Sequence, residues 1–387
     1  LDGVTLDDCT ATGDGGAVYV ADGGVLTMLD STVTTSSATN GGGIAVAPGG
    51  ELVAIASTVD GTTASPGSGG GIWADGAELD LDDVQLTGGY AATSGGGLYA
   101  HDATVTLTSL WVDDAVAEAH GGAVLLDGAG GLVDGLSATD CFANEPITVI
   151  GADPLPGIVE LNYAGRAYPL LDVHDIDVSG GDAGCGLSVH EPQTLTTVDD
   201  VVVHAPTTYG INLETQLTDA QVAILEARHL LVTEASTGLR MDTFGEQMSI
   251  EVHNATLLGQ YTGLSGFVFA SSGRASNILA TATNGFGIGV SWTDLGVNGN
   301  GGTDLSYAYV LDGASFTRWY SGGTYYDHDD PPPFCDSCGG VANRPLDADY
   351  QLSGPLSGKG DPTQCGPSDP PSCLDPGYWG GPGAPTP

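Results

Sequence analysis

The chain has 387 residues, with 49 acidic side chains against seven Lys and Arg, and a formal net charge of −42. This charge excludes nucleic acids and anionic membrane surfaces as partners, because both are bound through Lys and Arg. Hydrophobic residues make up 41% of the chain, which is enough for a long core, and no apolar run has the length of a membrane span.

The chain contains 62 glycines and seven cysteines. Together with the scarcity of Lys and the abundance of Thr and Ser, this composition predicts an exported protein of an oxidising compartment. The chain starts at Leu1 within a repeat and without a leader sequence. We therefore expect a processed or incomplete piece of a longer precursor.

A glycine motif recurs in the first third of the chain, as GGAVYV, GGGIAV, GGGIWA, GGGLYA and GGAVLL. Counted from the first residue after the glycines, the repeats are 25 to 28 residues apart. Such a period, with alternating β-branched and apolar residues, is typical of stacked β-strand units. We expect the residues after the glycines to be buried in one column: Ala17, Ile44, Ile72, Leu98 and Ala123.

A second column has the same period. It starts with the small or polar residues Gly3, Asp30, Ala56, Asp83 and Ser109. Further along the chain it continues as five residues that we call the polar ladder: Asp175, Asp200, His229, Asn254 and Asn277. We expect these side chains to follow one another at or beside a turn, with Asn254 and Asn277 hydrogen-bonded best. A ligand or catalytic role for His229 is the alternative to this structural role.

These two columns predict an all-β fold, a single-stranded right-handed parallel β-helix of about twelve coils with an irregular C-terminal cap. Further along the chain, a glycine followed by an apolar residue marks the expected start of the equivalent strand. The apolar residues of these pairs are Leu187, Ile211, Leu239, Leu264 and Ile288. We expect the β-helix to span residues 1–315, with Gly-rich coils over 1–150 and less regular coils over 151–315. Residues 316–387, rich in Cys and Pro, would form the cap and tail.

The glycine motifs resemble the repeats of polymorphic outer-membrane proteins and of autotransporter-like surface β-helices of bacteria. Those repeats also carry an FxxN motif, whose nearest equivalent here is Cys141-Phe142-Ala143-Asn144. The segments DADYQLSGPLSGKGDP (Asp347–Pro362) and DPGYWGGPGA (Asp375–Ala384) are similar to the end of secreted bacterial right-handed β-helix proteins. The resemblance implies the fold and export, whereas β-helices serve adhesins, stalks and enzymes alike.

No catalytic residue is assigned. The six Arg residues are scattered along the sequence, and the single Lys, Lys359, lies in the expected cap. Carboxylate pairs suited to glycoside hydrolysis are inevitable among 49 acidic residues and carry no information. A polysaccharide-active enzyme, a glycoside hydrolase or lyase, is the alternative to a non-enzymatic module. No cofactor is expected, and surface carboxylates could bind Ca²⁺ weakly.

Four cysteines lie near the C-terminus, at Cys335, Cys338, Cys365 and Cys373. We predict the disulfides Cys335–Cys338 and Cys365–Cys373, with pairings between the two groups left open. A zinc site formed by the same four thiolates is the alternative. Cys9, Cys141 and Cys185 lie on well-separated coils and should stay unpaired within the chain.

Aromatic side chains gather in FTRWYSGGTYYDHDD (Phe316–Asp330). This segment either covers the open end of the core or forms a contact patch for a glycan or a protein through Trp319, Tyr320, Tyr325 and Tyr326. The function expected overall is that of an extracellular structural or adhesive β-helix module at the cell surface. Its partner would be a cell-surface or extracellular molecule such as a glycan, or further copies of itself in a filament or sheath.

Overall fold

The structure is a computed structural model of the whole chain. It describes residues 1–144, 157–162, 171–190, 196–216, 223–244, 248–259, 261–269, 272–282, 286–292, 302–310, 315–321, 324–328 and 339–340. Across these residues the regular structure consists of strands, without a helix. Accordingly, no helix in these ranges is long and apolar enough to cross a membrane.

The parallel strands form a β-solenoid of about nine turns. The parallel β-helix is thus confirmed, whereas the expected count of twelve coils is not. The chain divides into two compact units. Unit 1 contains residues 1–191 and 205–207, and unit 2 contains residues 192–204 and 208–387. The boundary expected at residue 315 is a different division and stays a prediction.

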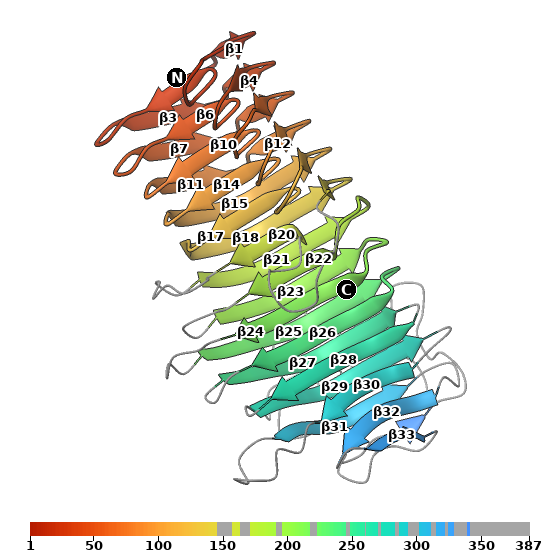
Figure 1. The fold of residues 1–387 in the computed structure, drawn as a ribbon. Helices are drawn as coiled ribbons and strands as arrows, with labels where there is room; N and C mark the ends of the chain where they lie inside the picture. The colour runs from red at the N-terminus through yellow and green to blue at the C-terminus, as the bar shows by residue number, and fades with distance from the viewer. Residues whose placement is uncertain are drawn as a thin grey trace. The chain divides into compact units, whose positions relative to one another are not determined.

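Unit 1 has strands on three faces (Figure 1). Its first sheet contains β1 (Thr5–Asp7), β3 (Val25–Leu29), β4 (Thr32–Thr34), β7 (Glu51–Ile55), β8 (Thr58–Asp60), β11 (Glu78–Asp82), β12 (Gln85–Thr87), β15 (Thr104–Asp113), β18 (Gly130–Thr139) and β21 (Leu171–Ser179). Its second sheet contains β2 (Val18–Val20), β6 (Ile44–Val46), β10 (Ile72–Asp75), β14 (Leu98–His101), β17 (Val124–Asp127), β20 (Gly157–Asn162) and β22 (Cys185–His190). The third contains β5 (Ser37–Ala38), β9 (Thr63–Ala64), β13 (Tyr90–Ala91), β16 (Val116–Ala117) and β19 (Phe142–Ala143).

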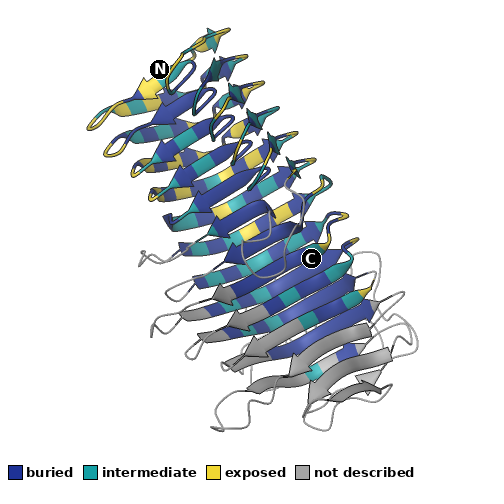
Figure 2. Cartoon of the chain, viewed as in Figure 1, coloured by how far each residue is buried: buried dark blue, intermediate teal, exposed yellow. Residues whose placement is uncertain are grey.

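Inward side chains of unit 1 stack in columns of like residues. On the second sheet, Ile44, Ile72 and Leu98 are register partners and fully buried. The third sheet contributes a column of buried alanines at its second position. Figure 2 shows buried residues alternating with more exposed ones along the strands of the first sheet. The core therefore follows from period-2 alternation within each strand and like-with-like stacking between coils.

The glycine motif forms the turn that precedes each strand of the second sheet. Gly69, its first residue in the third repeat, has a φ of +69°, a conformation that Gly adopts without strain. A Cβ at the next residue, Gly70, would collide with the carbonyl oxygen of Gly96 in the following coil. The first two glycines are therefore required for the backbone conformation and for the close approach of successive coils.

The expected column after the glycines is wrong at its two ends. The backbone N–H groups of Ala17, Gly43, Gly71 and Gly97 each donate to the equivalent residue one coil on, ending at Ala123. Ala17 and Ala123 therefore occupy the position of the third glycine. The true column is Val18, Ile44, Ile72, Leu98 and Val124. The first two glycines set the register, and Ala can replace the third.

One of the corners in each coil of unit 1 is formed by a left-handed residue between two strand segments of the first sheet. In β15, Ser109 has a φ of 51°, and the register with β18 passes over it from Thr108 to Leu110. The same conformation occurs at Gly3, Asp30, Ala56, Asp83, Gly135 and Asp175. The second sequence column is thus the column of corner residues, a conformation that Gly, Asn and Asp tolerate best.

The described residues of unit 2 form two sheets. The first contains β23 (Thr196–His204), β25 (Ala223–Thr233), β27 (Met248–Gly259), β29 (Ser272–Ala282), β31 (Gly302–Val310) and β34 (Gly339–Gly340). The second contains β24 (Tyr209–Gln216), β26 (Thr237–Phe244), β28 (Thr262–Phe269), β30 (Phe286–Trp292), β32 (Ser315–Ser321) and β33 (Thr324–His328). The predicted starts Ile211, Leu239, Leu264 and Ile288 are register partners, which confirms the period in this unit.

Regular strands extend beyond residue 315. β30 pairs in parallel with β32, and β32 pairs with β33 in the antiparallel sense. Strands are therefore present in the part of the chain that the sequence predicts to be irregular.

Candidate functional site

The polar ladder residues all adopt the left-handed conformation, with φ between 48° and 57°. Asp175 belongs to unit 1 and is exposed. In unit 2 the ladder lies in the middle of successive first-sheet strands, where His229, Asn254 and Asn277 are almost completely buried. Asn277 Nδ2 donates a hydrogen bond of 2.9 Å to Asn254 Oδ1. This bond connects the corners of two adjacent coils.

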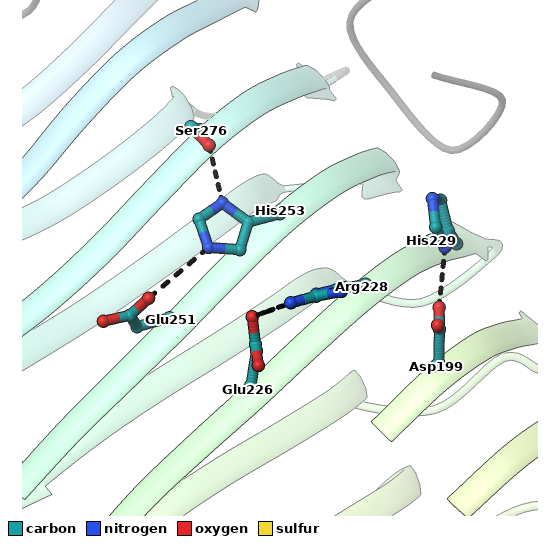
Figure 3. A network of polar contacts seen from close by, with 7 residues as sticks. All are labelled: Asp199, Glu226, Arg228, His229, Glu251, His253 and Ser276. Carbon is teal, nitrogen blue, oxygen red and sulfur yellow. Dashed lines mark hydrogen bonds and ion pairs between the residues drawn. The ribbon is translucent and has the colours of Figure 1, made fainter. Parts of the chain in front are cut away.

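His229 occupies a ladder position that faces two carboxylates. Its Nδ1 lies 2.6 Å from Asp199 Oδ1 and 3.5 Å from Asp200 Oδ1. Asp199 Oδ1 also accepts from the backbone N–H of Asp200, at 3.0 Å. The His229 side chain has no exposed surface, while Asp199 and Asp200 are 22% and 31% exposed. Figure 3 shows His229 and Asp199 reaching toward each other from neighbouring strands.

A second cluster lies on the outward side of β25, β27 and β29 (Figure 3). Glu226 and Glu251 are register partners, and so are Arg228, His253 and Ser276. Arg228 donates to Glu226 Oε1. The guanidinium therefore neutralises one of the two glutamates.

His253 is held from both sides. Its Nδ1 lies 2.7 Å from Ser276 Oγ, and its Nε2 lies 3.6 Å from Glu251 Oε2. Burial lowers the pKa of His253, although the charges of Glu251 and Glu226 act in the opposite direction. At neutral pH we therefore expect a neutral imidazole, which can act as a base or as a metal ligand.

Each cluster offers one imidazole and two carboxylates. Within Asp199, Asp200 and His229, and likewise within Glu226, Glu251 and His253, the potential ligand atoms lie within 4.8 Å of one another. Imidazole and carboxylate groups suit divalent transition metals. The Glu226 cluster already contains the cation of Arg228, which disfavours a metal there. The Asp199 cluster is the better candidate.

The outer face of the second sheet in unit 1 carries aromatic and acidic residues in register. Tyr19, Trp73 and Tyr99 belong to one row, in which Ala45 separates Tyr19 from Trp73. Tyr19 is 52% exposed, and Trp73 and Tyr99 are partly exposed. We call this row the aromatic row.

Two positions further along the strands lie Asp75, His101 and Asp127, also in register. His101 Nδ1 is 2.6 Å from Asp75 Oδ1, and the Tyr99 hydroxyl donates to Asp127 Oδ2 at 3.4 Å. The rings of Tyr99 and His101 stack with their planes 4° apart. This face therefore offers flat rings beside carboxylate oxygens.

The contact patch predicted from the sequence lies in β32 and β33. The antiparallel register places Trp319 opposite Tyr326, and Tyr320 opposite Tyr325. The hairpin thus brings the four residues together along the backbone. Cys335, Cys338, Cys365 and Cys373 lie outside the described residues, so both the disulfide and the zinc predictions stay open. Cys9 and Cys141 are free thiols.

Sequence reasoning missed the glutamate cluster and the aromatic row. The signal was present in the segments LEARH, IEVHN and GRASN, which end on the ladder residues His229, Asn254 and Asn277. When the three segments are aligned on these residues, Glu226 and Glu251 occupy one position. Arg228, His253 and Ser276 occupy another. Extending the ladder alignment by three residues would have revealed the cluster.

Comparisons with known proteins find no family model, no curated protein and no solved structure that matches this chain. The resemblance to bacterial surface β-helices therefore rests on the sequence motifs alone.

Proposed function

We propose that this chain is an extracellular structural or adhesive module of a bacterial cell surface, in which a rigid acidic β-solenoid presents a binding face. The observation that carries this proposal is the outer face of the second sheet in unit 1. There the aromatic row lies beside Asp75, His101 and Asp127, all fixed by strand register.

The chemistry of this face fits a glycan. Aromatic rings offer flat apolar surfaces against which the C–H faces of sugars can pack, and carboxylates accept hydrogen bonds from sugar hydroxyls. Successive strands lie about 4.8 Å apart, so a linear polysaccharide running across them would meet one side chain after another. The net charge of −42 favours neutral or amino-sugar polymers over acidic ones.

The finer features of the fold belong to the same proposal. We propose a right-handed β-helix that reaches about twelve coils and ends in a C-terminal cap stabilised by the disulfides Cys335–Cys338 and Cys365–Cys373. Trp319, Tyr320, Tyr325 and Tyr326 would form a second contact patch in the cap. Export and display resemble those of polymorphic outer-membrane proteins, and copies of the chain could assemble into a filament or sheath.

The test is binding to an array of neutral, amino-sugar and acidic glycans. We expect the full chain to bind a neutral or amino-sugar polymer, and Trp73→Ala combined with Tyr99→Ala to abolish that binding. Trp111→Ala is the matched control, because Trp111 is 41% exposed on the first sheet, away from the aromatic row. Binding that survives the double substitution, or a chain that binds none of the glycans, would refute the proposal for this face.

A polysaccharide-active enzyme is the second candidate, favoured by the register pair Glu226 and Glu251 beside His253. Two carboxylates on adjacent strands are the groups that glycoside hydrolysis requires. Release of reducing sugar from the same glycans would support it, provided that Glu226→Gln and Glu251→Gln each remove the activity. Activity that persists in both variants, or no release from any glycan, would exclude this pair as the catalytic residues.

A further inference from the structure

The ladder position of His229 differs from those that follow it. The next two ladder residues in unit 2, Asn254 and Asn277, bond to each other through their amides. His229 instead directs Nδ1 to the side chains of Asp199 and Asp200. A fully buried imidazole thus points one nitrogen at two carboxylates that are themselves partly exposed.

The other ring nitrogen has a different environment. His229 Nε2 is buried and has no hydrogen-bond partner among the described residues. If His229 served only to connect neighbouring ladder residues, we would expect its Nε2 to form a hydrogen bond to one of them, as the amides of Asn254 and Asn277 do. Among the described residues, the polar contacts of the imidazole are all at its Nδ1, with two aspartates that are partly exposed.

From this arrangement we infer that Asp199, Asp200 and His229 form a binding site for a divalent transition-metal ion of the Zn²⁺ class. One imidazole nitrogen and two carboxylate oxygens are three ligands, and they leave a fourth position for water, as in open zinc sites. The two carboxylates balance the charge of the ion. Small rearrangements suffice, because the three donor atoms already lie within 4.8 Å of one another.

The combination of one imidazole and two carboxylates determines which cations the proposed site would bind. Ca²⁺ requires six to eight oxygen ligands, and Mg²⁺ retains most of its water, so neither gains from an imidazole. Zn²⁺, Co²⁺ and Ni²⁺ bind imidazole well. Arg228 is the register partner of Asp199, but its guanidinium donates to Glu226. It is therefore engaged outside the proposed site.

The experiment is calorimetric titration of the metal-free full chain with Zn²⁺, in buffer with excess Ca²⁺ to saturate weak carboxylate sites. We expect one site per chain whose affinity falls at least tenfold in Asp199→Asn and in His229→Asn. His229→Asn should fold, because asparagine occupies the same ladder position in the next two coils. His253→Gln is the matched control from the other imidazole–carboxylate cluster and should bind normally.

Absorption of the Co²⁺-loaded protein provides a second readout. A tetrahedral site with nitrogen and oxygen ligands should give visible bands that disappear in His229→Asn. If His229→Asn binds Zn²⁺ as the unsubstituted chain does, or if His253→Gln is the variant that loses binding, the inference is wrong. Should His229→Asn fail to fold, Asp199→Asn decides, because Asp199 is partly exposed and outside the core.

Discussion

Asn277 and Asn254 are joined side chain to side chain across two coils, through a 2.9 Å hydrogen bond from Nδ2 of the first to Oδ1 of the second. Both residues are buried, and both have a φ of 57°. Each asparagine therefore stabilises the corner of its coil in two ways. It tolerates the left-handed backbone conformation, and its amide can both donate and accept hydrogen bonds.

We expect Asn277→Ala to lower the free energy of unfolding by about 1–3 kcal/mol, because Asn254 Oδ1 would remain buried without its donor. Alanine also strains the left-handed backbone, which glycine does not. Asn277→Gly should therefore be less destabilising than Asn277→Ala. Urea denaturation of the three proteins measures both effects, and equal stability of Asn277→Ala and the unsubstituted chain would contradict the structural role of the bond.

The corner column could be predicted from the sequence because its spacing is regular and because Asp and Asn recur in it. Its left-handed conformation could not be read at Ala56 or Ser109, whose side chains do not favour it. At those coils the conformation is imposed by parallel pairing with neighbouring coils. The preference of Asp and Asn for the left-handed conformation thus identified the column where these residues occupy it. At the other coils, parallel pairing with neighbouring strands determines the conformation.

The glycine turn provides a second test. We expect Gly70→Ala to destabilise unit 1 strongly, because the new Cβ would collide with the backbone carbonyl of Gly96. Gly71→Ala should be much milder. Its Cβ would lie 2.7 Å from the Gly97 carbonyl oxygen, so the backbone must shift, but other coils accommodate Ala17 and Ala123 at the equivalent position.

Thermal unfolding of the two single variants measures this difference. Similar losses in both would show that the third glycine is as necessary as the second. The same comparison explains the register error in the sequence prediction. The sequence prediction aligns the repeats on the residue after the last glycine of each motif. Because the first two glycines determine the turn, the predicted column is shifted by one residue in the repeats that have only two glycines.

Cys141 should be unreactive in the folded protein. The pKa of its thiol is raised to about 12, chiefly by burial and to a lesser extent by the carboxylates of Asp113, Asp114 and Asp140, against an opposing backbone hydrogen bond at Ala115. The thiolate is the reactive form. At pH 7.5 we expect iodoacetamide to modify the partly exposed Cys9 readily, and Cys141 only after denaturation.

Mass spectrometry of the digested protein locates the modification. The raised pKa also predicts the direction of a pH effect on stability. The unfolded thiol loses its proton at lower pH than the folded one, so this contribution is complete below the unfolded pKa and declines as the pH rises above about 8.5. Rapid modification of Cys141 in the native protein would contradict the buried position.

The glutamate cluster could not be foreseen from the sequence of any single strand. Glu226 and Glu251 are separated by a whole coil, and they meet only because the strands pair in parallel without a shift. The ladder residues His229 and Asn254, which the sequence did identify, fix that register. The sequence prediction covered only the ladder residues. His253 lies one residue before the ladder, and Glu226 and Glu251 lie three residues before it.

His253 provides the last prediction, a loss of stability in mild acid. Burial lowers the pKa of this imidazole in the folded protein below its ordinary value of 6.5. In the unfolded chain the residue takes up a proton near its ordinary pKa, whereas the folded protein resists it. The contribution of His253 is therefore complete above pH 6.5 and is lost as the pH falls toward the folded pKa.

We expect His253→Gln to reduce the drop in unfolding midpoint between pH 7.5 and pH 5.5, because glutamine does not titrate and can still bond to Ser276. His174→Gln is the matched control, since His174 is 36% exposed on unit 1, with its Nε2 3.2 Å from Asp172 Oδ1. Its acid response should equal that of the unsubstituted chain. An undiminished drop in His253→Gln would mean that protonation of His253 is not what destabilises the protein, and that its imidazole takes up a proton as easily in the folded protein as in the unfolded chain.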